Sequence, residues 1–220
     1  MTAPDPAREA VLARVRGALR DVPGDERAAD VAVTRDYRRR GTLAGDALAE
    51  LFAERCADYR ADVRMVTAAE LPAAIAAALE RRGARRLAIP ADLPQAWRVD
   101  GVDWVVDEPA APRSHEQLSA ADGVVTGCAV AIAETGVIVL DGDAAQGRRA
   151  LTLLPDYHLC VVARERIVEL VPEAVAALHD AARAGRPMTW IAGPSATSDI
   201  EFNRVEGVHG PRTLDVLVVG

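Results

Sequence analysis

The strongest constraint on the fold is a regular alternation of short β-type runs and helical stretches in the first half of the chain. Apolar residues form short runs in 62–67, 86–90 and 102–106, and recur at helical spacing in 69–82 and 92–97. Gly83 follows the first helical stretch, where a residue with positive φ commonly ends a helix. A strand–helix–strand–helix–strand order predicts parallel strands joined by right-handed crossovers, with helices covering the sheet.

The second half adds further strands and one hairpin. The apolar runs 124–133 and 137–140 flank Glu134, Thr135 and Gly136, a pattern typical of an antiparallel hairpin with a glycine turn. A short helix is predicted over 114–121, where Ser114 and Gln117 have the spacing of a capping box. The remaining predicted elements are strands over 158–163, 188–192 and 214–219 and one long helix over 165–184. The sequence therefore predicts an α/β fold with a mostly parallel sheet and an antiparallel hairpin.

The first forty residues read differently. Ala7, Val11, Val15 and Leu19 lie four apart, which predicts an amphipathic helix over 5–20. The stretch that follows has no sustained period and mixes Pro, Gly and charged residues, as an exposed linker does. We therefore divide the chain into an N-terminal helix and linker, 1–40, and an α/β domain, 41–220.

Charge and composition exclude several classes of protein. The net charge of −7 and the pI near 5.2 argue against a general nucleic-acid binder, which needs a concentrated basic face. No segment approaches the ~20 uninterrupted apolar residues of a membrane helix. The first residues also lack the basic and apolar regions of a secretory signal. We expect a cytoplasmic protein with neither nucleic acid nor membrane as a partner.

The residue types that carry covalent and metal chemistry are scarce. All 26 basic residues are arginine, so a lysine Schiff base, a pyridoxal-phosphate anchor and a P-loop lysine are excluded. Cys56, Cys128 and Cys160 are far apart in sequence and form no CxxC or Cys/His cluster. We interpret them as buried small apolar residues and expect neither a metal site nor a cofactor bound by this chain.

Two polar loops near the end of the chain are the best candidates for a binding site. In GPSATSDIE, Ser195, Thr197 and free backbone amides could bind a phosphate or carboxylate at a helix start. Ser198 and Glu201 have capping-box spacing, so a well-capped helix with no ligand is the alternative. Asp199 and Glu201 disfavour a highly charged anion, because like charges repel.

Two further residues have the chemistry of an acid or base. In GVHGP, His209 lies between Gly207 and Gly210 and is a candidate acid–base or binding group, although a lone histidine is more often structural. Glu134 is the one acidic residue in the apolar window 124–140 and is either an exposed turn residue or an inward-pointing site group. His158 and His179 have the pattern of structural residues.

Three stretches taken together, TGCAVAIAETGVIVL, GPSATSDIE and GVHGPRTLDVLVV, resemble the lactate-utilization protein C family of LUD-domain proteins. The order and spacing of all three agree, and the resemblance covers residues 40–220. The positions that match the motifs are Thr126, Gly127, Glu134, Thr135, Gly136, Gly193, Ser195, Thr197, Asp199, Glu201, Gly207, His209 and Gly210.

The resemblance implies a fold similar to the NagB/RpiA/CoA-transferase group, a three-layer α/β/α Rossmann-like sandwich. It also implies a part in the oxidation of L-lactate to pyruvate, alongside iron–sulfur partner proteins that would carry the redox centres. We expect the chain to bind a small carboxylate or anion. Glu134, Asp199 and His209 are the candidate catalytic residues, and the other matched polar and glycine positions are the candidate ligand-binding residues.

Two alternatives stay open. One is a CoA or acyl transferase with Glu134 as the nucleophile, since transferases of this fold group use a glutamate near a glycine. The other is a non-catalytic, ligand-binding regulatory module. In either case we expect the Gly193 loop and the Glu134 hairpin to form two walls of one cleft, at the carboxyl ends of the parallel strands.

Overall fold

The computed structural model describes residues 6–197, 205–206 and 209–220, and it divides into two units, Met1–Tyr37 and Arg38–Gly220. The first unit contains the predicted helix, α1 (Pro6–Ala18), and a short 3-10 turn, η1 (Ala28–Asp30). No residue of α1 is buried. The second unit holds the β-sheets and the packed cores of the described residues, so the remaining description concerns it alone.

A six-stranded parallel sheet forms the centre of the second unit. Its order is β1 (Asp62–Val66), β12 (Thr213–Val219), β7 (Tyr157–Ala163), β4 (Gly123–Thr126), β2 (Arg86–Pro90) and β3 (Asp103–Asp107). Nearly all residues of β7 and β12 are buried, as expected for strands covered on both faces. The predicted parallel pairing is confirmed, but β1 pairs with β12 rather than with β2, because the crossover from β1 spans three strands.

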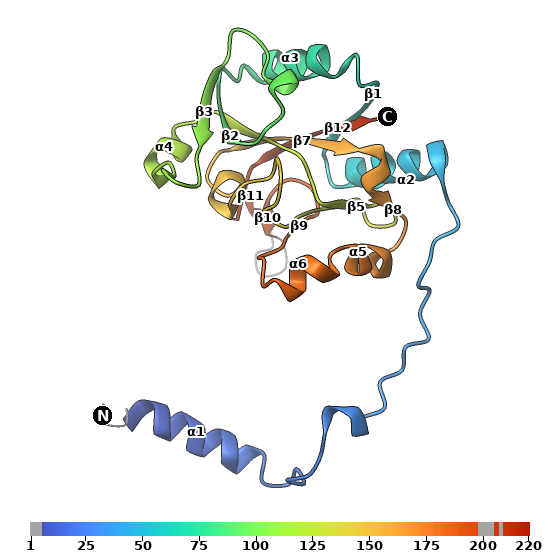
Figure 1. Cartoon of the computed structure of the whole chain (residues 1–220), viewed down its shortest axis with the longest axis vertical. Helices are drawn as coiled ribbons and strands as arrows, with labels where there is room; N and C mark the ends of the chain where they lie inside the picture. Colours follow the sequence, from blue (N-terminus) through green and yellow to red (C-terminus); the bar gives the residue numbers. More distant parts are fainter. Residues whose placement is uncertain (1–5, 198–204, 207–208) are drawn as a thin grey trace. The chain divides into compact units, whose positions relative to one another are not determined.

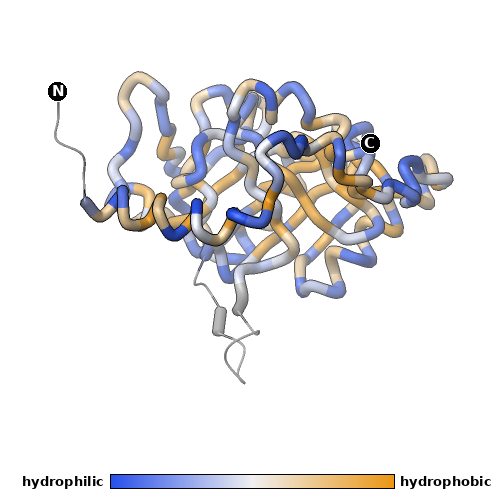
Figure 2. The backbone as a smooth tube through the Cα atoms, turned by 90° about the horizontal axis from the view of Figure 1, so that it is seen from below, coloured by the Kyte–Doolittle hydropathy of each residue, from blue (hydrophilic) through white to orange (hydrophobic). Residues whose placement is uncertain are grey.

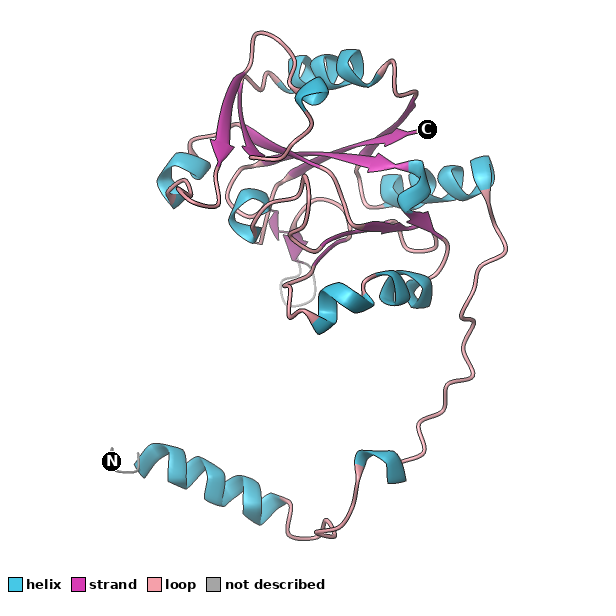
Figure 3. Cartoon of the chain, in the orientation of Figure 1, coloured by secondary structure: helices cyan, strands magenta, loops and turns pink. Residues whose placement is uncertain are grey.

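A smaller four-stranded sheet packs beneath the first (Figure 3). Its order is β8 (Ile167–Val168), β5 (Val130–Ile132), β6 (Val137–Leu140) and β9 (Thr189–Ile191). Strands β5 and β6 form the predicted antiparallel hairpin, and Gly136 in its turn has a φ of 64°. The apolar run 124–133, however, is two strands: β4 joins the large sheet and β5 the small one.

Helices complete the layers (Figure 1). Helix α3 (Leu71–Arg82) covers one face of the large sheet, with Ile75 and Leu79 in an apolar cluster against Leu87 and Leu159. Helix α2 (Gly45–Asp58) packs against the other face, between the sheets, where Phe52 is fully buried. The outer face of the small sheet is covered by α5 (Val171–Ala177) and α6 (His179–Arg183).

Burial follows this layering. Apolar residues are concentrated on the interior strands (Figure 2). The fold is thus of the predicted α/β class with a mostly parallel sheet. The small sheet lies on the same side of the large sheet as α2. None of the helices in the described part of the chain is long and apolar enough to cross a membrane.

The prediction of one helix over 165–184 is wrong. Arg164–Arg166 is a 3-10 turn (η4), β8 follows, and α5 begins only at Val171 with Pro172 in its first turn. A proline favours this position because the amide it lacks has no intrahelical partner there. The β-branched pair Ile167–Val168 forms a short strand that pairs with β5 in parallel, not a helix.

Two local predictions hold. Helix α4 (His115–Ser119) begins with the capping box of Ser114 and Gln117, and α3 ends at Gly83 with a φ of 65°. The helix predicted over 92–97 is only a single 3-10 turn, η2 (Gln95–Trp97). The helix start expected at Ser198 lies outside the described residues; the flanking segments β10 (Ala196–Thr197) and β11 (Val205–Glu206) form a two-stranded antiparallel ladder.

Candidate functional site

A cavity of about 230 Å³ lies at the amino ends of β7 and β12. The described residues that line it are Arg149, Thr152, His158, Thr189, Trp190, Ile191, Ala192, Gly193, Pro194, Ser195, His209, Gly210, Pro211 and Leu214. Both polar loops singled out from the sequence therefore meet in one place. They do so at the amino ends of these two strands, however, not at the carboxyl ends where we expected them. We call this space the amino-end cavity.

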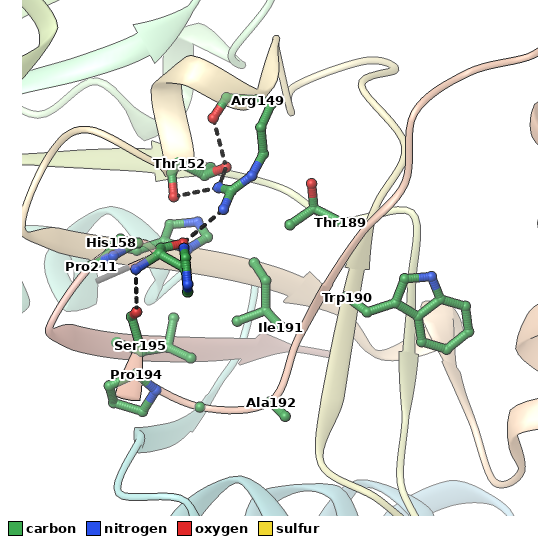
Figure 4. A pocket seen from close by; sticks show the side chains of 14 residues that line it. Arg149, Thr152, His158, Thr189, Trp190, Ile191, Ala192, Pro194, Ser195 and Pro211 are labelled. Atoms are coloured by element: carbon green, nitrogen blue, oxygen red, sulfur yellow. Dashed lines mark hydrogen bonds between the residues drawn. The ribbon is translucent and has the colours of Figure 1, made fainter. Parts of the chain in front are cut away.

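Arg149 is the one arginine among the described residues that line the cavity. It belongs to a 3-10 turn, η3 (Arg149–Thr152), and its Nη1 donates to the Thr152 carbonyl at 2.8 Å and to Thr152 Oγ1 at 3.1 Å. Its Nη2 donates to the His209 carbonyl at 2.8 Å. Figure 4 shows the side chain held in this position, with the Trp190 indole turned away from it. The guanidinium is thus fixed by neutral oxygens.

The charge of Arg149 has no counter-ion in the described structure. No carboxylate of the described chain forms an ion pair with it, and no described lining residue is acidic. Burial lowers the pKa of Arg149, although a guanidinium stays charged at any physiological pH. The neighbouring Arg148, by contrast, binds both carboxylate oxygens of Asp107 through Nε and Nη2, at 2.8 and 3.0 Å. Among the described lining residues, the guanidinium of Arg149 is therefore a positive charge without a carboxylate partner.

His158 forms the floor of the cavity. Its ring is buried, and Nε2 lies 2.8 Å from Thr126 Oγ1 on the adjacent strand. Burial, with a smaller contribution from the charge of Arg149, lowers the pKa of His158 from 6.5 to about 4. The imidazole is consequently neutral at physiological pH, so it can donate or accept a hydrogen bond without adding charge. Thr126, a predicted ligand residue, lies behind this ring.

The two polar loops are tied to each other by backbone contacts. The His209 N–H donates to Ser195 Oγ at 3.0 Å, and the Ser195 N–H donates to the Pro211 carbonyl at 2.8 Å. Gly193 has a φ of 74°, and a Cβ there would lie 2.5 Å from Tyr59 Cβ, so only glycine fits. Gly193, Ser195, His209 and Gly210 are thus brought together as predicted residues, with His209 exposed at the rim.

Glu134 lies elsewhere. It does not line the amino-end cavity; its exposed carboxylate pairs with Arg38, which also lies 3.9 Å from Glu169. A Cβ on Gly136 would lie 2.6 Å from the Arg55 carbonyl carbon, so the hairpin turn packs against α2. Thr135 Oγ1 is buried without a hydrogen-bond partner among the described residues. The hairpin turn therefore does not line the amino-end cavity, although Gly136 and Gly193 both pack against the end of α2, at Arg55 and Tyr59.

Four predicted residues cannot be placed in the site. Asp199, Glu201 and Gly207 lie outside the described residues. Thr197 ends β10, and its backbone pairs with Val205. Within the described parts of the chain no group of His, Cys, Asp and Glu side chains is arranged to hold a metal ion.

Comparisons with known proteins support the fold, and the matched residues include those of the site. The family model described as LUD domain matches residues 49–219, a range that includes every residue lining the amino-end cavity. The chain belongs to the LUD domain family.

Named relatives of this LUD domain come from several bacteria. A protein named lactate utilization protein C from Deinococcus radiodurans is 57% identical over 169 residues, which cover 77% of this chain and 78% of the relative. One of the same name from Halalkalibacterium halodurans is 30% identical over 185 residues, covering 79% and 80%. A crystal structure of a DUF162 family protein from D. radiodurans at 1.70 Å superimposes with a TM-score of 0.70 and 47% identity, over 81% of this chain and 100% of that one.

The sequence analysis did not identify Arg149 as a residue of the cavity. Arg149 stands next to Arg148 in the sequence, and only the fold decides that Arg148 meets Asp107 while Arg149 enters the cavity of the LUD domain. His158 was taken as structural because it opens an apolar strand, and it is indeed buried. It lines the site all the same, because its ring lies where β7 begins.

Proposed function

We propose that this LUD domain is a component of an L-lactate utilization system, in which L-lactate is oxidised to pyruvate, and that it binds a small carboxylate in the amino-end cavity. Two observations on relatives support the system: the family match and the name lactate utilization protein C carried by relatives that align over more than three quarters of their length. The binding role rests on the cavity itself.

Arg149 carries the proposal. A guanidinium has five N–H donors, and the three bonds to Thr152 and His209 use at most three of them. A carboxylate is the group that best complements the remaining donors and the charge, because it can accept two charge-assisted hydrogen bonds in one plane. The absence of acidic groups among the described lining residues leaves that charge for a ligand.

The other polar groups suit a small hydroxy or keto acid. The lining residues Thr189 and Ser195 carry hydroxyls, and His158 offers a neutral imidazole, so a ligand hydroxyl or carbonyl can be hydrogen-bonded beside its carboxylate. Ile191 and Leu214 supply apolar contact for a methyl group. At about 230 Å³ the cavity is small, which favours a compact ligand over a nucleotide or an acyl-CoA.

The redox centres belong, in this proposal, on iron–sulfur partner proteins. The chain has three cysteines, one fewer than the four thiolates that hold a common cluster. The LUD domain would then contribute carboxylate binding to an assembly whose electron transfer occurs on other subunits. We accordingly propose that this chain itself holds no cofactor.

A deletion and complementation experiment tests this role. A strain lacking the chain should fail to grow on L-lactate while growing normally on pyruvate, and the wild-type sequence should restore growth. Arg149→Gln should not restore it, whereas Arg86→Gln should, because Arg86 carries the same charge in an exposed ion pair with Asp103. Tagged wild-type protein should co-purify proteins with iron–sulfur absorbance. Normal growth of the deletion strain on L-lactate would remove the proposal.

The transferase alternative has no structural observation in its favour. A nucleophilic Glu134 would have to attack an acyl group, but its carboxylate is exposed, paired with Arg38 and not among the residues that line the amino-end cavity. We therefore propose no second function.

A further inference from the structure

The three cysteines, far apart in sequence, meet in the core between the two sheets. Cys56 of α2 and Cys160 of β7 belong to one buried apolar cluster, and Cys128 packs against it. All three are free thiols. The fold thus gathers the chain's whole complement of thiols at one place, although no sequence motif links them.

Cys128 and Cys160 stand in a particular relation. Thr126, the last residue of β4, is the register partner of Cys160 on β7, and Cys128 follows two residues later. The Cys160 thiol donates to the Gly127 carbonyl at 3.6 Å, so it points at the backbone that leads into Cys128. The neighbouring Cys128 thiol, together with burial, raises the pKa of the Cys160 thiol. Cys128 therefore lies close to Cys160, at the carboxyl end of β4.

One of these thiols is accessible and the other is not. Cys128 is half-buried and lines a second cavity, of about 360 Å³, whereas Cys160 is fully buried behind it. Val219, Ala163 and Gly127 lie at or just past the carboxyl ends of β12, β7 and β4, and they line this carboxyl-end cavity with small and apolar groups. The carboxyl edge of a parallel sheet is where small molecules commonly enter such folds.

Thr126 connects this thiol pair to the amino-end cavity. Its Oγ1 lies 4.0 Å from Cys160 Sγ and 2.8 Å from His158 Nε2. Both contacts are buried, so water cannot replace a partner that the Thr126 hydroxyl loses when Cys160 changes. His158 in turn lines the amino-end cavity. One hydroxyl therefore stands between the thiol pair and the floor of the proposed carboxylate site.

We propose that Cys128 and Cys160 form a reversible disulfide when a small peroxide enters the carboxyl-end cavity, and that this oxidation is transmitted through Thr126 to His158. The Cys128 sulfur attacks the peroxide, whose O–O bond breaks: thiol and hydrogen peroxide give sulfenic acid and water. The Cys160 sulfur then displaces hydroxide from the sulfenic acid, and the thiol proton leaves with it as a second water. A thiol or dithiol reductant returns two electrons to the disulfide and restores both thiols. Because the second step needs the Cys160 thiolate, its rate rises with pH.

Thiol trapping on the full-length protein tests the disulfide. Trypsin, which cleaves here only after arginine, places the three cysteines on separate peptides, 56–60, 114–148 and 150–164. After treatment with hydrogen peroxide and alkylation in denaturant, we expect peptides 114–148 and 150–164 to be linked and 56–60 to be alkylated. Cys56→Ser, the matched control, should give the same link. Cys160→Ser should stop at a sulfenic acid on Cys128 that dimedone captures.

Three results would overturn the disulfide. They are a link that includes Cys56, an irreversible oxidation of Cys128 with no link in the wild-type chain, and peptides 114–148 and 150–164 that stay fully alkylated after peroxide treatment.

The transmission to His158 needs a readout that does not depend on the proposed function. The ¹⁵N chemical shift of His158 Nε2, followed by NMR, should differ between the reduced and the disulfide form and return on reduction. In Thr126→Val, which lacks the bridging hydroxyl, the two forms should give the same shift. Identical shifts in the wild-type protein would refute the transmission, whether or not L-lactate binds.

Discussion

Two arginine sites occupy opposite faces of the same two strands. On the α3 face, Asp215 of β12 is 1% exposed and accepts hydrogen bonds from Arg81, Arg82 and Tyr157, at 3.2, 2.6 and 3.0 Å. His158 follows Tyr157 on β7 and points to the opposite face of the sheet, where it lines the cavity that holds Arg149. Both sites lie at the amino ends of β7 and β12, so strand alternation alone separates them.

The difference between the two sites is whether the chain neutralises its own charge. At this site the carboxylates of Asp215 and Asp62 balance the guanidinium groups of Arg81 and Arg82, and the phenol of Tyr157 donates to Asp215. At Arg149 the described chain supplies carbonyl and hydroxyl oxygens but no carboxylate. A charge that is balanced internally stabilises the fold, whereas a fixed charge left in a cavity is available to a ligand.

The largest effect should follow from breaking the balanced site. Asp215→Ala removes the acceptor of two arginines and one tyrosine, and loss of one partner of a buried ion pair costs about 3–5 kcal/mol. Because Arg81 and Arg82 are each about one-third exposed and can be rehydrated, we expect the lower end, about 3 kcal/mol. Urea unfolding measures it. An unchanged midpoint would contradict the structural role assigned to Asp215.

The second prediction concerns pH and the cavity face. His158 binds a proton less tightly in the folded chain, with a pKa of about 4, than in the unfolded one, near 6.5. Stability is therefore complete above pH 6.5 and falls as pH decreases toward 4, by about 3 kcal/mol. His158→Gln keeps a polar partner for Thr126 but does not titrate. The difference between its urea midpoints and those of the wild type should grow only below pH 6.5; parallel curves would contradict a neutral, buried His158.

A third prediction concerns a buried hydroxyl that has no hydrogen-bond partner among the described residues and does not line the amino-end cavity. Thr135 Oγ1 is buried and unpaired among the described residues. Thr135→Val replaces the hydroxyl with a methyl group of similar size, so the chain should be stabilised by up to about 1 kcal/mol. Thr152→Val, whose hydroxyl accepts from Arg149, is the matched control and should be destabilised. Destabilisation of Thr135→Val would show that its hydroxyl has a partner.

The smallest effect is expected at the hairpin turn. Glu134 and Arg38 are both largely exposed, and an exposed ion pair contributes about 0–1 kcal/mol. Glu134→Gln should therefore change stability by less than about 1 kcal/mol and leave carboxylate binding unaltered. Isothermal titration calorimetry of the variant checks the second point. Loss of binding would move the site toward the hairpin and revive the transferase alternative.

Much of the fold could be predicted because it is encoded locally. The strand–helix alternation, the Ser114 capping box, the Gly83 helix end and the Gly136 turn each depend on a few neighbouring residues. The predictions that were wrong concern what lies far away in sequence. An apolar run such as 124–133 reads the same whether it forms one strand or two, since both sheets bury it.

The site shows the same limit. The loops that carry Ser195 and His209 could be found from their composition, and they do meet in the cavity. Nothing in the sequence separates Arg149 from Arg148, because the distinction is the position of Asp107. Likewise Cys128 and Cys160 look unrelated until β4 and β7 pair. Chemistry that depends on which partner a side chain meets has to be read from the fold.

The central claim is that Arg149 binds a small carboxylate, and one titration tests it most directly. Calorimetry of L-lactate with the wild-type protein, Arg149→Gln and Arg86→Gln compares the cavity arginine with an exposed arginine of equal charge. We expect one binding site in the wild type and in Arg86→Gln, and at least about a tenfold loss of affinity in Arg149→Gln, since a charge-assisted hydrogen bond contributes roughly 1.5–3 kcal/mol. Equal affinity in all three proteins, or no binding to the wild type, would contradict the account.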